Sequence, residues 1–347
     1  QQPLRISAIS EVDTPQNWIG ARYPRKEDAA LLTGNARFID DMEPVAGIRH
    51  VAILRSSHAH ARITSIDTSK AEALPGVHGV VTGVDIASVT NPIPSAIRVP
   101  IKFYPIAVDK VRYVGEPVAV IAAIDRYVAE DAMELIEIEY ESLPPVADPV
   151  LALEEGASLL HDDVGSNQVH HRTFKYGDPD AAFASADKIV KLDWRYPRYS
   201  STPMETYGVV ANFERQPDRY TIWSNFQGPF ILHALMTGAL GVPGNRLRLI
   251  TAPHSGGSFG IKQAMFPYMV LLGACSKLLG CPLKWIEDRL EHLIGSSMAA
   301  DRADKVEAAF SRDGELQGLR FDNIVNVGAF VRAPEPASVY RMHSASN

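Results

Sequence analysis

The sequence contains little cysteine. Cys275 and Cys281 are the 2 cysteines among its 347 residues. Two thiolates cannot hold an iron–sulfur cluster or a structural zinc ion without other ligands. Any iron–sulfur centre that works with this chain must therefore belong to a different chain. Cys275 lies in an apolar, helix-like stretch, which predicts a buried free thiol in a reducing compartment.

Runs of basic residues and long apolar runs are also absent. The net charge of −7 argues against a nucleic-acid surface. The most apolar stretch, residues 264–279, is shorter than the roughly 20 residues of a membrane-spanning helix, and Lys277 interrupts it. We therefore expect no transmembrane segment, and no signal-peptide pattern is visible. Because residue 1 is Gln1 and not Met, we expect that the true N-terminus was processed or lies outside this sequence.

The remaining composition is that of an ordinary globular protein. Hydrophobic residues make up 46% of the chain and charged residues 22%, which is enough for a sizeable core. The length predicts about two to three domains.

A Gly-rich segment at residues 251–262, TAPHSGGSFGIK, lacks the two common nucleotide-binding patterns. A Walker-type phosphate loop requires Gly-Lys-Ser/Thr, but Ile261 separates Gly260 from Lys262, and the spacing of the dinucleotide fingerprint is absent too. The segment nevertheless leads from a strand-like run into a helix-like run, an arrangement that presents backbone N–H groups to an anion. A turn that serves only the backbone path is the alternative for this segment alone.

The same segment resembles a known family. Residues 256–262, GGSFGIK, resemble the Gly-Gly-x-Phe-Gly-x-Lys segment of the molybdenum-containing large subunits of the xanthine oxidase family. Further segments resemble that family in the same order along the chain: residues 20–28, 32–41, 55–63, 113–120 and 284–292. The resemblance spans about residues 18 to 347 and is greatest to the branch that contains the large subunits of aerobic carbon monoxide dehydrogenases.

The resemblance implies an α+β fold, with a hammerhead-type domain followed by part of a mixed α/β molybdopterin-binding domain. We expect an N-terminal arm at residues 1–17, the hammerhead domain at 18–148, a linker at 149–173 and the first part of the cofactor-binding domain at 174–347. The residues themselves favour this division, because the prolines of residues 143–149 exclude a helix and disfavour a central strand.

Local patterns predict the individual elements. Strands are expected at residues 50–54, 77–81, 118–122, 136–140, 188–196, 207–213, 220–225, 246–250, 283–287, 305–311 and 315–327. Helices are expected at residues 125–135, 177–187, from Pro229 onward, 264–279 and 288–299. Asp125 is the predicted N-cap of the first of these helices, and Gly280 ends the helix at 264–279.

The resemblance also implies a cofactor site. Gln227 and Phe259 are the candidate catalytic residues, because Gln227 resembles the family's glutamine beside the apical oxo ligand of molybdenum and Phe259 lies at the metal centre. The candidate cofactor-binding residues share these two segments: Gln227, Gly256, Gly257, Ser258, Phe259, Gly260 and Lys262. No side chain is expected to ligate the metal directly. A glutamine that only meets turn backbone is the alternative for Gln227.

Several neighbours carry finer expectations. Gln263 is the candidate substrate contact. Its neutral amide makes a purine a less favoured substrate without excluding it, because the purine-oxidising branch has a glutamate there. Ser258 replaces a frequent glycine and would not adopt a positive φ without strain. Lys262 would either neutralise a cofactor phosphate or cap a carbonyl. Glu205, in a Met-Glu segment that resembles the family, is predicted to be a buried structural carboxylate.

The pair His58 and His60 is a weaker candidate. On a strand the two imidazoles would share a face and could hold a metal ion. No nearby cysteine or carboxylate completes a zinc site, so a structural or interfacial role is favoured.

Taken with the resemblance, the chain is expected to be the N-terminal half of the catalytic large subunit of a molybdenum hydroxylase or dehydrogenase. The implied substrate is a small organic molecule, an aldehyde or N-heterocycle, or a CO-like molecule. The implied cofactor is molybdenum–molybdopterin in its cytosine dinucleotide form, with FAD and 2Fe-2S clusters on partner chains. The implied partners are the C-terminal half of the large subunit on another chain, an FAD-binding medium subunit and an iron–sulfur small subunit.

Two other classes of function stay open. The family's general-base glutamate lies near the C-terminal end of its longer subunits, so this chain alone is not expected to catalyse a reaction. A non-catalytic cofactor-binding scaffold or assembly protein is the first alternative, and a binding module built on the first domain is the second. The expected location is cytoplasmic, with peripheral attachment to the inner face of the membrane as a variant.

Overall fold

The computed structural model describes residues 19–21, 23–95 and 99–332, and it divides the chain after Arg37 into two compact units. The predicted arm at residues 1–17 lies outside the described residues. In the first unit the structure describes one short helix, α1 (Asp28–Leu32). The sheets and the candidate site all belong to the second unit, which begins at Phe38.

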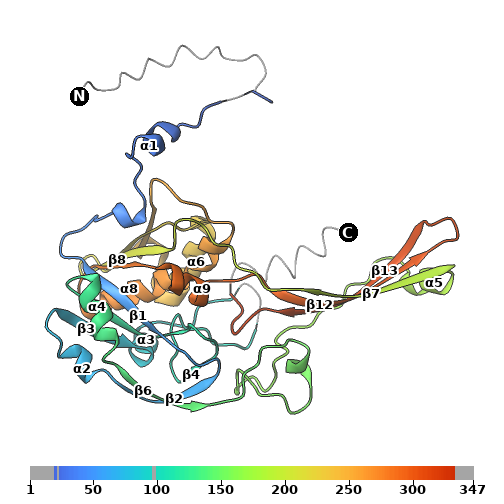
Figure 1. Ribbon diagram of the computed structural model, residues 1–347, viewed down its shortest axis with the longest axis horizontal. Helices are drawn as coiled ribbons and strands as arrows, with labels where there is room; N and C mark the ends of the chain where they lie inside the picture. Colours follow the sequence, from blue (N-terminus) through green and yellow to red (C-terminus); the bar gives the residue numbers. More distant parts are fainter. Residues whose placement is uncertain (1–18, 22, 96–98, 333–347) are drawn as a thin grey trace. The chain divides into compact units, whose positions relative to one another are not determined.

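A seven-stranded sheet forms the centre of the second unit (Figure 1). Its strands, in spatial order, are β10 (Leu247–Thr251), β9 (Arg219–Ser224), β8 (Gly208–Glu214), β11 (Leu283–Ile286), β1 (Arg49–Arg55), β5 (Pro117–Ala123) and β3 (Val77–Thr82). The pairs β9/β10 and β1/β11 are parallel, and the other pairs are antiparallel.

This sheet combines strands from both sides of the predicted linker. β1 pairs with β11 through Arg49 opposite Leu283 and His50 opposite Lys284. The predicted boundary therefore does not coincide with a break in the sheet, and the division into domains stays a prediction. The predicted linker is itself anchored, because Nε2 of His161 lies 2.7 Å from the Ala329 carbonyl.

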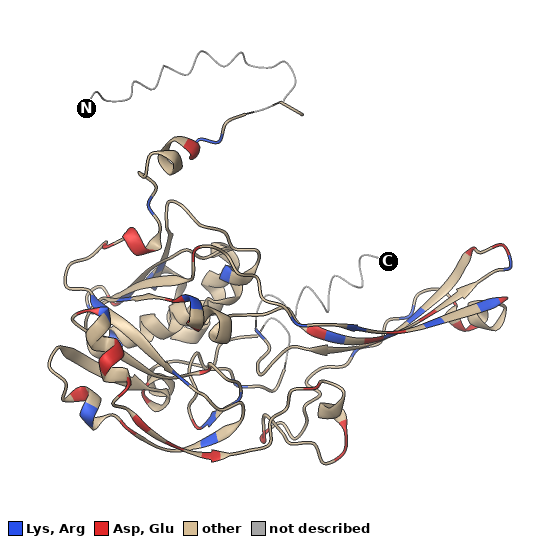
Figure 2. Cartoon of the chain, viewed as in Figure 1, with Lys and Arg blue, Asp and Glu red and all other residues tan. Residues whose placement is uncertain are grey.

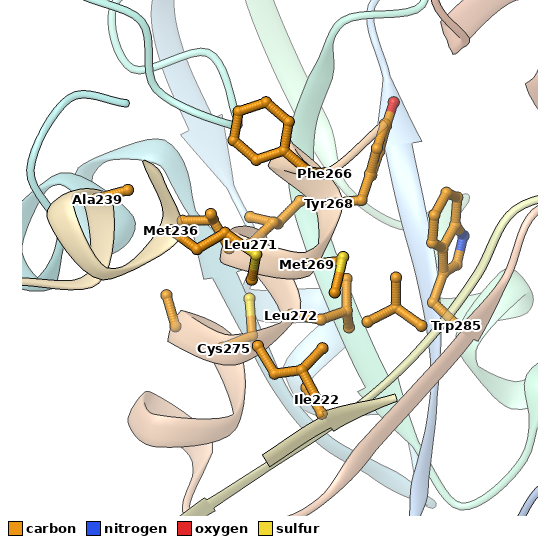
Figure 3. Close-up of a cluster of buried hydrophobic side chains, with 14 of the residues drawn as sticks. Ile222, Met236, Ala239, Phe266, Tyr268, Met269, Leu271, Leu272, Cys275 and Trp285 are labelled. Carbon is orange, nitrogen blue, oxygen red and sulfur yellow. The ribbon is translucent and has the colours of Figure 1, made fainter. Parts of the chain in front are cut away.

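Helix α8 (Pro267–Leu279) supplies much of the core. Its residues from Pro267 to Ser276 are buried. Figure 3 shows its side chains packed with Trp285 of β11, Ile222 of β9 and Met236 of α6 (Pro229–Leu240). We predicted one helix over residues 264–279, which is wrong at its start. A short helix, α7 (Ile261–Ala264), comes first. Pro267 then begins α8. Proline suits this position because the N–H that it lacks would have no partner in the first turn of a helix.

Two smaller sheets complete the fold. One contains β4 (Lys110–Val111), β2 (Ala61–Asp67) and β6 (Glu137–Ser142). The other contains β13 (Leu316–Asn326), β12 (Asp301–Phe310) and β7 (Lys188–Tyr196), and helix α5 (Pro179–Ala184) packs against β13. The remaining elements are α2 (Ser69–Glu72), α3 (Gly83–Val89), α4 (Arg126–Met133), α9 (Arg289–Gly295) and the 3₁₀ turns Ile39–Asp41, Leu151–Leu153 and Gly244–Arg246.

Most predicted strands and helices are confirmed, and two further predictions are wrong at one boundary. The predicted helix at residues 288–299 ends at Gly295, because Ser296 is already extended and Ala299 donates to the Tyr199 carbonyl. Residues 58–60 lie in the bend between β1 and β2, so the strand geometry that would place both imidazoles on one face does not apply to His58 and His60. β12 begins at Asp301 and not at residue 305. Among the described residues, no helix is long and apolar enough to cross a membrane.

The buried position of α8 leads to a first prediction. Leu272 is 0% exposed, whereas Leu278 on the same helix is 37% exposed. Leu272→Ala should lower the free energy of unfolding by about 2–5 kcal/mol, because it leaves a cavity in a closely packed core. Leu278→Ala, the matched control, should cost about 1 kcal/mol or less. Urea denaturation of the three proteins measures both values, and equal losses would contradict the placement of α8 in the core.

Candidate functional site

Two loops meet at one edge of the central sheet. β9 and β10 run parallel, with Ser224 opposite Thr251, so their carboxyl ends lie at the same edge. Residues 225–228 follow β9, and the Gly-rich loop, defined here as residues 252–260, follows β10. Ligands of α/β folds commonly bind in the crevice outside the carboxyl ends of parallel strands.

A direct hydrogen bond joins the two loops. The Ser258 hydroxyl donates to Oε1 of Gln227 over 2.7 Å. The Gln227 side chain is exposed, and Phe259 is 78% exposed although it is a large apolar residue. The half-buried Gln263 lies nearby, since its Nε2 is 2.9 Å from the place that a Cβ on Gly228 would occupy. The structure therefore brings Gln227, Ser258, Phe259 and Gln263 together at one surface.

The backbone of the Gly-rich loop is tightly packed at Gly256 and Gly257. A Cβ on Gly256 would lie 2.4 Å from Cβ of Glu205, and a Cβ on Gly257 would lie 3.1 Å from the Phe259 ring. Gly257 has a φ of +99°, a left-handed conformation that favours glycine. From the sequence, Ser258 was the residue at which a positive φ would cause strain. In the structure the non-glycine residue of this loop with a positive φ is Phe259, at 52°. Strained residues of this kind gather at functional sites.

Glu205 holds the Gly-rich loop in place. Its Oε2 accepts hydrogen bonds from the Gly256 N–H at 2.8 Å and from Nζ of Lys262 at 2.5 Å. The Glu205 N–H also donates to the Gly256 carbonyl at 3.3 Å. These contacts fit the structural carboxylate that we predicted.

Lys262 is buried beneath the loop. Its side chain is 1% exposed, and its ammonium pairs with Glu205. Burial lowers the pKa of Lys262, and the charge and hydrogen bond of Glu205 offset only part of that effect. The sequence left two roles open for Lys262: a partner for a cofactor phosphate or a cap for a backbone carbonyl. The contact observed is with a different group, the Glu205 carboxylate. The cofactor-binding assignment of Lys262 stays a prediction.

A second buried pair lies behind the loop, between Glu287 after β11 and His292 on α9. Nδ1 of His292 is 2.7 Å from Oε2 of Glu287, and Nε2 is 3.2 Å from the Ser201 carbonyl. The Ser201 hydroxyl in turn donates to the Phe259 carbonyl at 3.2 Å. Because both ring nitrogens face oxygen acceptors, the imidazolium form satisfies both contacts.

Charge and burial act in opposite directions on His292. Burial by itself lowers the pKa of His292, but the hydrogen bond and charge of Glu287, with the Ser201 carbonyl, outweigh burial and raise it. We did not single out Glu287, His292 or Ser201 from the sequence. Glu287 and His292 lie within residues 284–292, a segment that carries the family resemblance. That resemblance is the sequence feature that could have identified them.

The N-terminus of α6 lies beside the same loops. Its N-cap is Gly228, in a left-handed conformation, and no side chain caps this end within the part of the chain that the structure describes. Pro229 occupies the first turn. The unpaired N–H groups and the helix dipole give this end a partial positive charge, which favours an anionic ligand.

His58 and His60 lie elsewhere and have structural partners. Nδ1 of His60 is 2.8 Å from the Pro144 carbonyl, and the His58 ring lies 4.5 Å from the Tyr140 ring. In the described ranges, no group of three or more His, Cys, Asp or Glu residues is placed to hold a metal ion.

The Glu287–His292 pair makes the stability of the fold depend on pH. The folded-state pKa of His292 lies above the unfolded-state value of about 6.5, so the charged ring stabilises the fold fully below that pH and loses this effect as pH rises through the folded-state pKa. The difference in unfolding free energy between the wild type and His292→Gln should be largest near about pH 6 and shrink toward about pH 9. Urea titrations across this range measure it, and a constant difference would contradict the charged pair.

Comparison with known proteins identifies two domain families along the chain. Residues 160–347 match the family model of the molybdopterin cofactor-binding domain. Residues 33–144 match the model of the a/b hammerhead domain of aldehyde oxidase and xanthine dehydrogenase. The candidate site lies within the first of these two matches.

Individual relatives extend the match along nearly the whole chain. The carbon monoxide dehydrogenase large chain of Afipia carboxidovorans is 35% identical, over 92% of this chain and 41% of its own length. The nicotine 6-hydroxylase large subunit of Paenarthrobacter nicotinovorans is 36% identical, over 93% of this chain and 40% of its own length. The crystal structure of quinoline 2-oxidoreductase from Pseudomonas putida 86 superposes with a TM-score of 0.84 at 36% identity, over 91% of this chain and 40% of that chain.

The chain thus spans about 40% of the length of the relatives that it matches. With both domain models matched in order, it belongs to the xanthine dehydrogenase and carbon monoxide dehydrogenase family of molybdenum-binding large subunits, and it corresponds to their N-terminal portion.

Proposed function

We propose that this chain is the N-terminal portion of the catalytic large subunit of a molybdenum hydroxylase or dehydrogenase. The observation that carries the proposal is the meeting of Gln227 and the Gly-rich loop at the carboxyl ends of β9 and β10, where Ser258 joins them. Relatives named for carbon monoxide, nicotine and quinoline support a small organic or CO-like substrate. An aldehyde or N-heterocycle is the organic class that we propose.

The residues present suit a phosphate-bearing pterin cofactor. The uncapped N-terminus of α6 favours a phosphate, and the absence of side chains at Gly256 and Gly257 gives the loop its tight path beside Glu205 and Phe259. The residues that would hold the cofactor are Gln227, Gly256, Gly257, Ser258, Phe259 and Gly260, with Lys262 acting through Glu205. When bound, molybdenum–molybdopterin, in the cytosine dinucleotide form that we propose, supplies the redox chemistry that the protein side chains lack.

Each of these residues would have a separate task. Because Oε1 of Gln227 accepts the Ser258 hydroxyl, the donor end of the amide is the end that can contact an acceptor on the cofactor. A neutral amide donates this hydrogen bond without adding charge. The exposed Phe259 ring would exclude water from the bound cofactor, and Gln263 would contact the substrate.

We further propose that this chain works in a heteromeric complex. Its partners would be the polypeptide that carries the rest of the large subunit, an FAD-binding medium subunit and a small subunit with 2Fe-2S clusters. The names large chain and large subunit among the relatives support several subunits. We place the complex in the cytoplasm, with peripheral attachment to the inner membrane face as a variant. The free state of Cys275 and Cys281 supports a reducing compartment.

Replacement of Gln227 tests the proposal. Gln227→Ala removes an exposed side chain, so the melting temperature of the complex should change little. The lost hydrogen bond to a charged or polarised group is worth roughly 1.5–3 kcal/mol, which corresponds to a roughly 10- to 150-fold slower turnover per molybdenum bound. Turnover, molybdenum content and pterin content are measured on the same preparation of the complex.

Gln168→Ala is the matched control, because Gln168 is an exposed glutamine outside the segments of both loops. It should leave turnover and cofactor content unchanged. Unchanged turnover in a fully loaded Gln227→Ala complex would sink the assignment of Gln227. Absence of molybdenum and pterin from the wild-type complex would sink the proposed function and favour a scaffold that does not catalyse.

A further inference from the structure

The segment of residues 199–206, between β7 and β8, contacts the Gly-rich loop at two points. We call it the backing segment. The Ser201 hydroxyl donates a hydrogen bond to the Phe259 carbonyl at 3.2 Å. Further along the segment, the Glu205 carboxylate accepts a hydrogen bond from the Gly256 N–H at 2.8 Å. The path of the loop therefore depends on where the backing segment lies.

Side chains of α9 hold the backbone of the backing segment from another side. Nε2 of His292 lies 3.2 Å from the Ser201 carbonyl. Nη2 of Arg289 lies 2.8 Å from the Pro203 carbonyl and 2.9 Å from the Met204 carbonyl, and donates to both. Figure 2 shows acidic and basic residues interspersed over the second unit, and here a charged side chain binds neutral backbone groups. The backing segment is thus fixed between α9 and the Gly-rich loop.

Phe259 is the residue of the loop whose conformation most needs such support. Its φ of 52° lies in the left-handed region, which a residue with a Cβ adopts only at a cost. Its ring is 78% exposed, so burial of the ring does not hold this conformation. A strained backbone persists only where surrounding contacts determine it. The hydrogen bond from Ser201 is such a contact, and it acts on the Phe259 backbone itself.

This hydrogen bond also sets the direction of the next backbone donor. The peptide bond from Phe259 to Gly260 is trans, since the cis bond of the described chain is the one before Pro217. In a trans peptide the carbonyl and the N–H point in opposite directions. With the Phe259 carbonyl turned toward Ser201, the Gly260 N–H points away from the backing segment. Gly260 is exposed, and a Cβ placed on it would meet no atom within 4 Å.

We propose that Ser201 is a positioning residue of the cofactor site: its hydroxyl holds the Phe259 carbonyl and thereby presents the Gly260 N–H and the Phe259 ring at the surface beside Gln227. This inference rests on the proposed function. Ser201 itself would not touch the cofactor. A backbone N–H fixed in advance binds an anionic or polarised acceptor without the cost of ordering the loop at that moment.

A purely structural hydrogen bond makes a different prediction. Its loss would lower the stability of the whole fold and leave the local opening of the loop unchanged. Loss of a positioning hydrogen bond acts locally, because loops open in separate events that need less free energy than global unfolding. The fraction of molecules with a binding-competent loop then falls, and the apparent affinity for the cofactor falls with it.

Three variants of the complex test the proposal. Ser201→Ala removes the hydroxyl, and Ser201→Thr retains one. Ser88→Ala is the matched control, because the Ser88 hydroxyl donates to the Asp85 carbonyl at 2.6 Å within α3, outside the segments of the site. Amide hydrogen exchange of residues 257–262, molybdenum retained during dialysis and the melting temperature are measured on each complex. If Ser201→Ala does not fold, Ser201→Cys replaces it, since a thiol of similar size is a weak donor.

Ser201→Ala should speed exchange of the loop amides by about two- to tenfold, the factor that corresponds to one net hydrogen bond. The half-time of molybdenum loss should shorten by about twofold or more. The melting temperature should change as little as in Ser88→Ala. Ser201→Thr should restore the exchange rate and the molybdenum retention, because it can donate the same hydrogen bond.

Two results would overturn the positioning role while the wild-type complex contains molybdenum. One is loop exchange and molybdenum retention in Ser201→Ala that equal those of the wild type. The other is an equal impairment of Ser201→Ala and Ser201→Thr, which would assign the effect to side-chain volume and not to the hydroxyl. Absence of molybdenum from the wild-type complex would overturn the proposed function and this inference with it.

Discussion

The carboxylate of Glu205 is the contact on which the candidate site depends. It accepts hydrogen bonds from the Gly256 N–H and from the Lys262 ammonium, so it connects the Gly-rich loop to the short helix that follows. A buried charge is tolerated only when it is paired and hydrogen-bonded, and here each partner satisfies the other. Removal of either one would leave an unpaired charge under the loop and change the path of the backbone.

The neighbouring Glu287–His292 pair extends this support. Through the Ser201 segment it contacts the Phe259 carbonyl, so the two ion pairs hold the same loop at Gly256 and at Phe259. The surface at which the two loops meet, in contrast, carries neutral groups: the Gln227 amide, the Ser258 hydroxyl and the Phe259 ring. The charged groups lie below the loop and hold its backbone in place. The surface presents neutral hydrogen-bonding side chains and backbone N–H groups, which suit an anionic cofactor.

Local features of the fold were predictable from sequence. The Asp125 side chain caps α4 at the Val128 N–H, and Gly280 ends α8 in a left-handed conformation, as their residue types indicate. The meeting of Gln227 with the Gly-rich loop was likewise implied by the family resemblance.

Longer-range features were not predictable. Pairing of β1 with β11 joins residues far apart in sequence, and no local pattern encodes it. The Lys262–Glu205 pair was missed for the same reason, because each residue read alone suits several partners. The bend that follows β1 and the positive φ of Phe259 were not indicated by the residue types at these positions.

Crystallography of the assembled complex at the molybdenum absorption edge tests the central claim most directly. Anomalous scattering locates the metal without assumptions about the protein. The account predicts a peak beside Gln227 and Phe259, outside the carboxyl ends of β9 and β10, with no protein side chain bound to the metal. A peak at another place in a fully molybdenum-loaded crystal would contradict it.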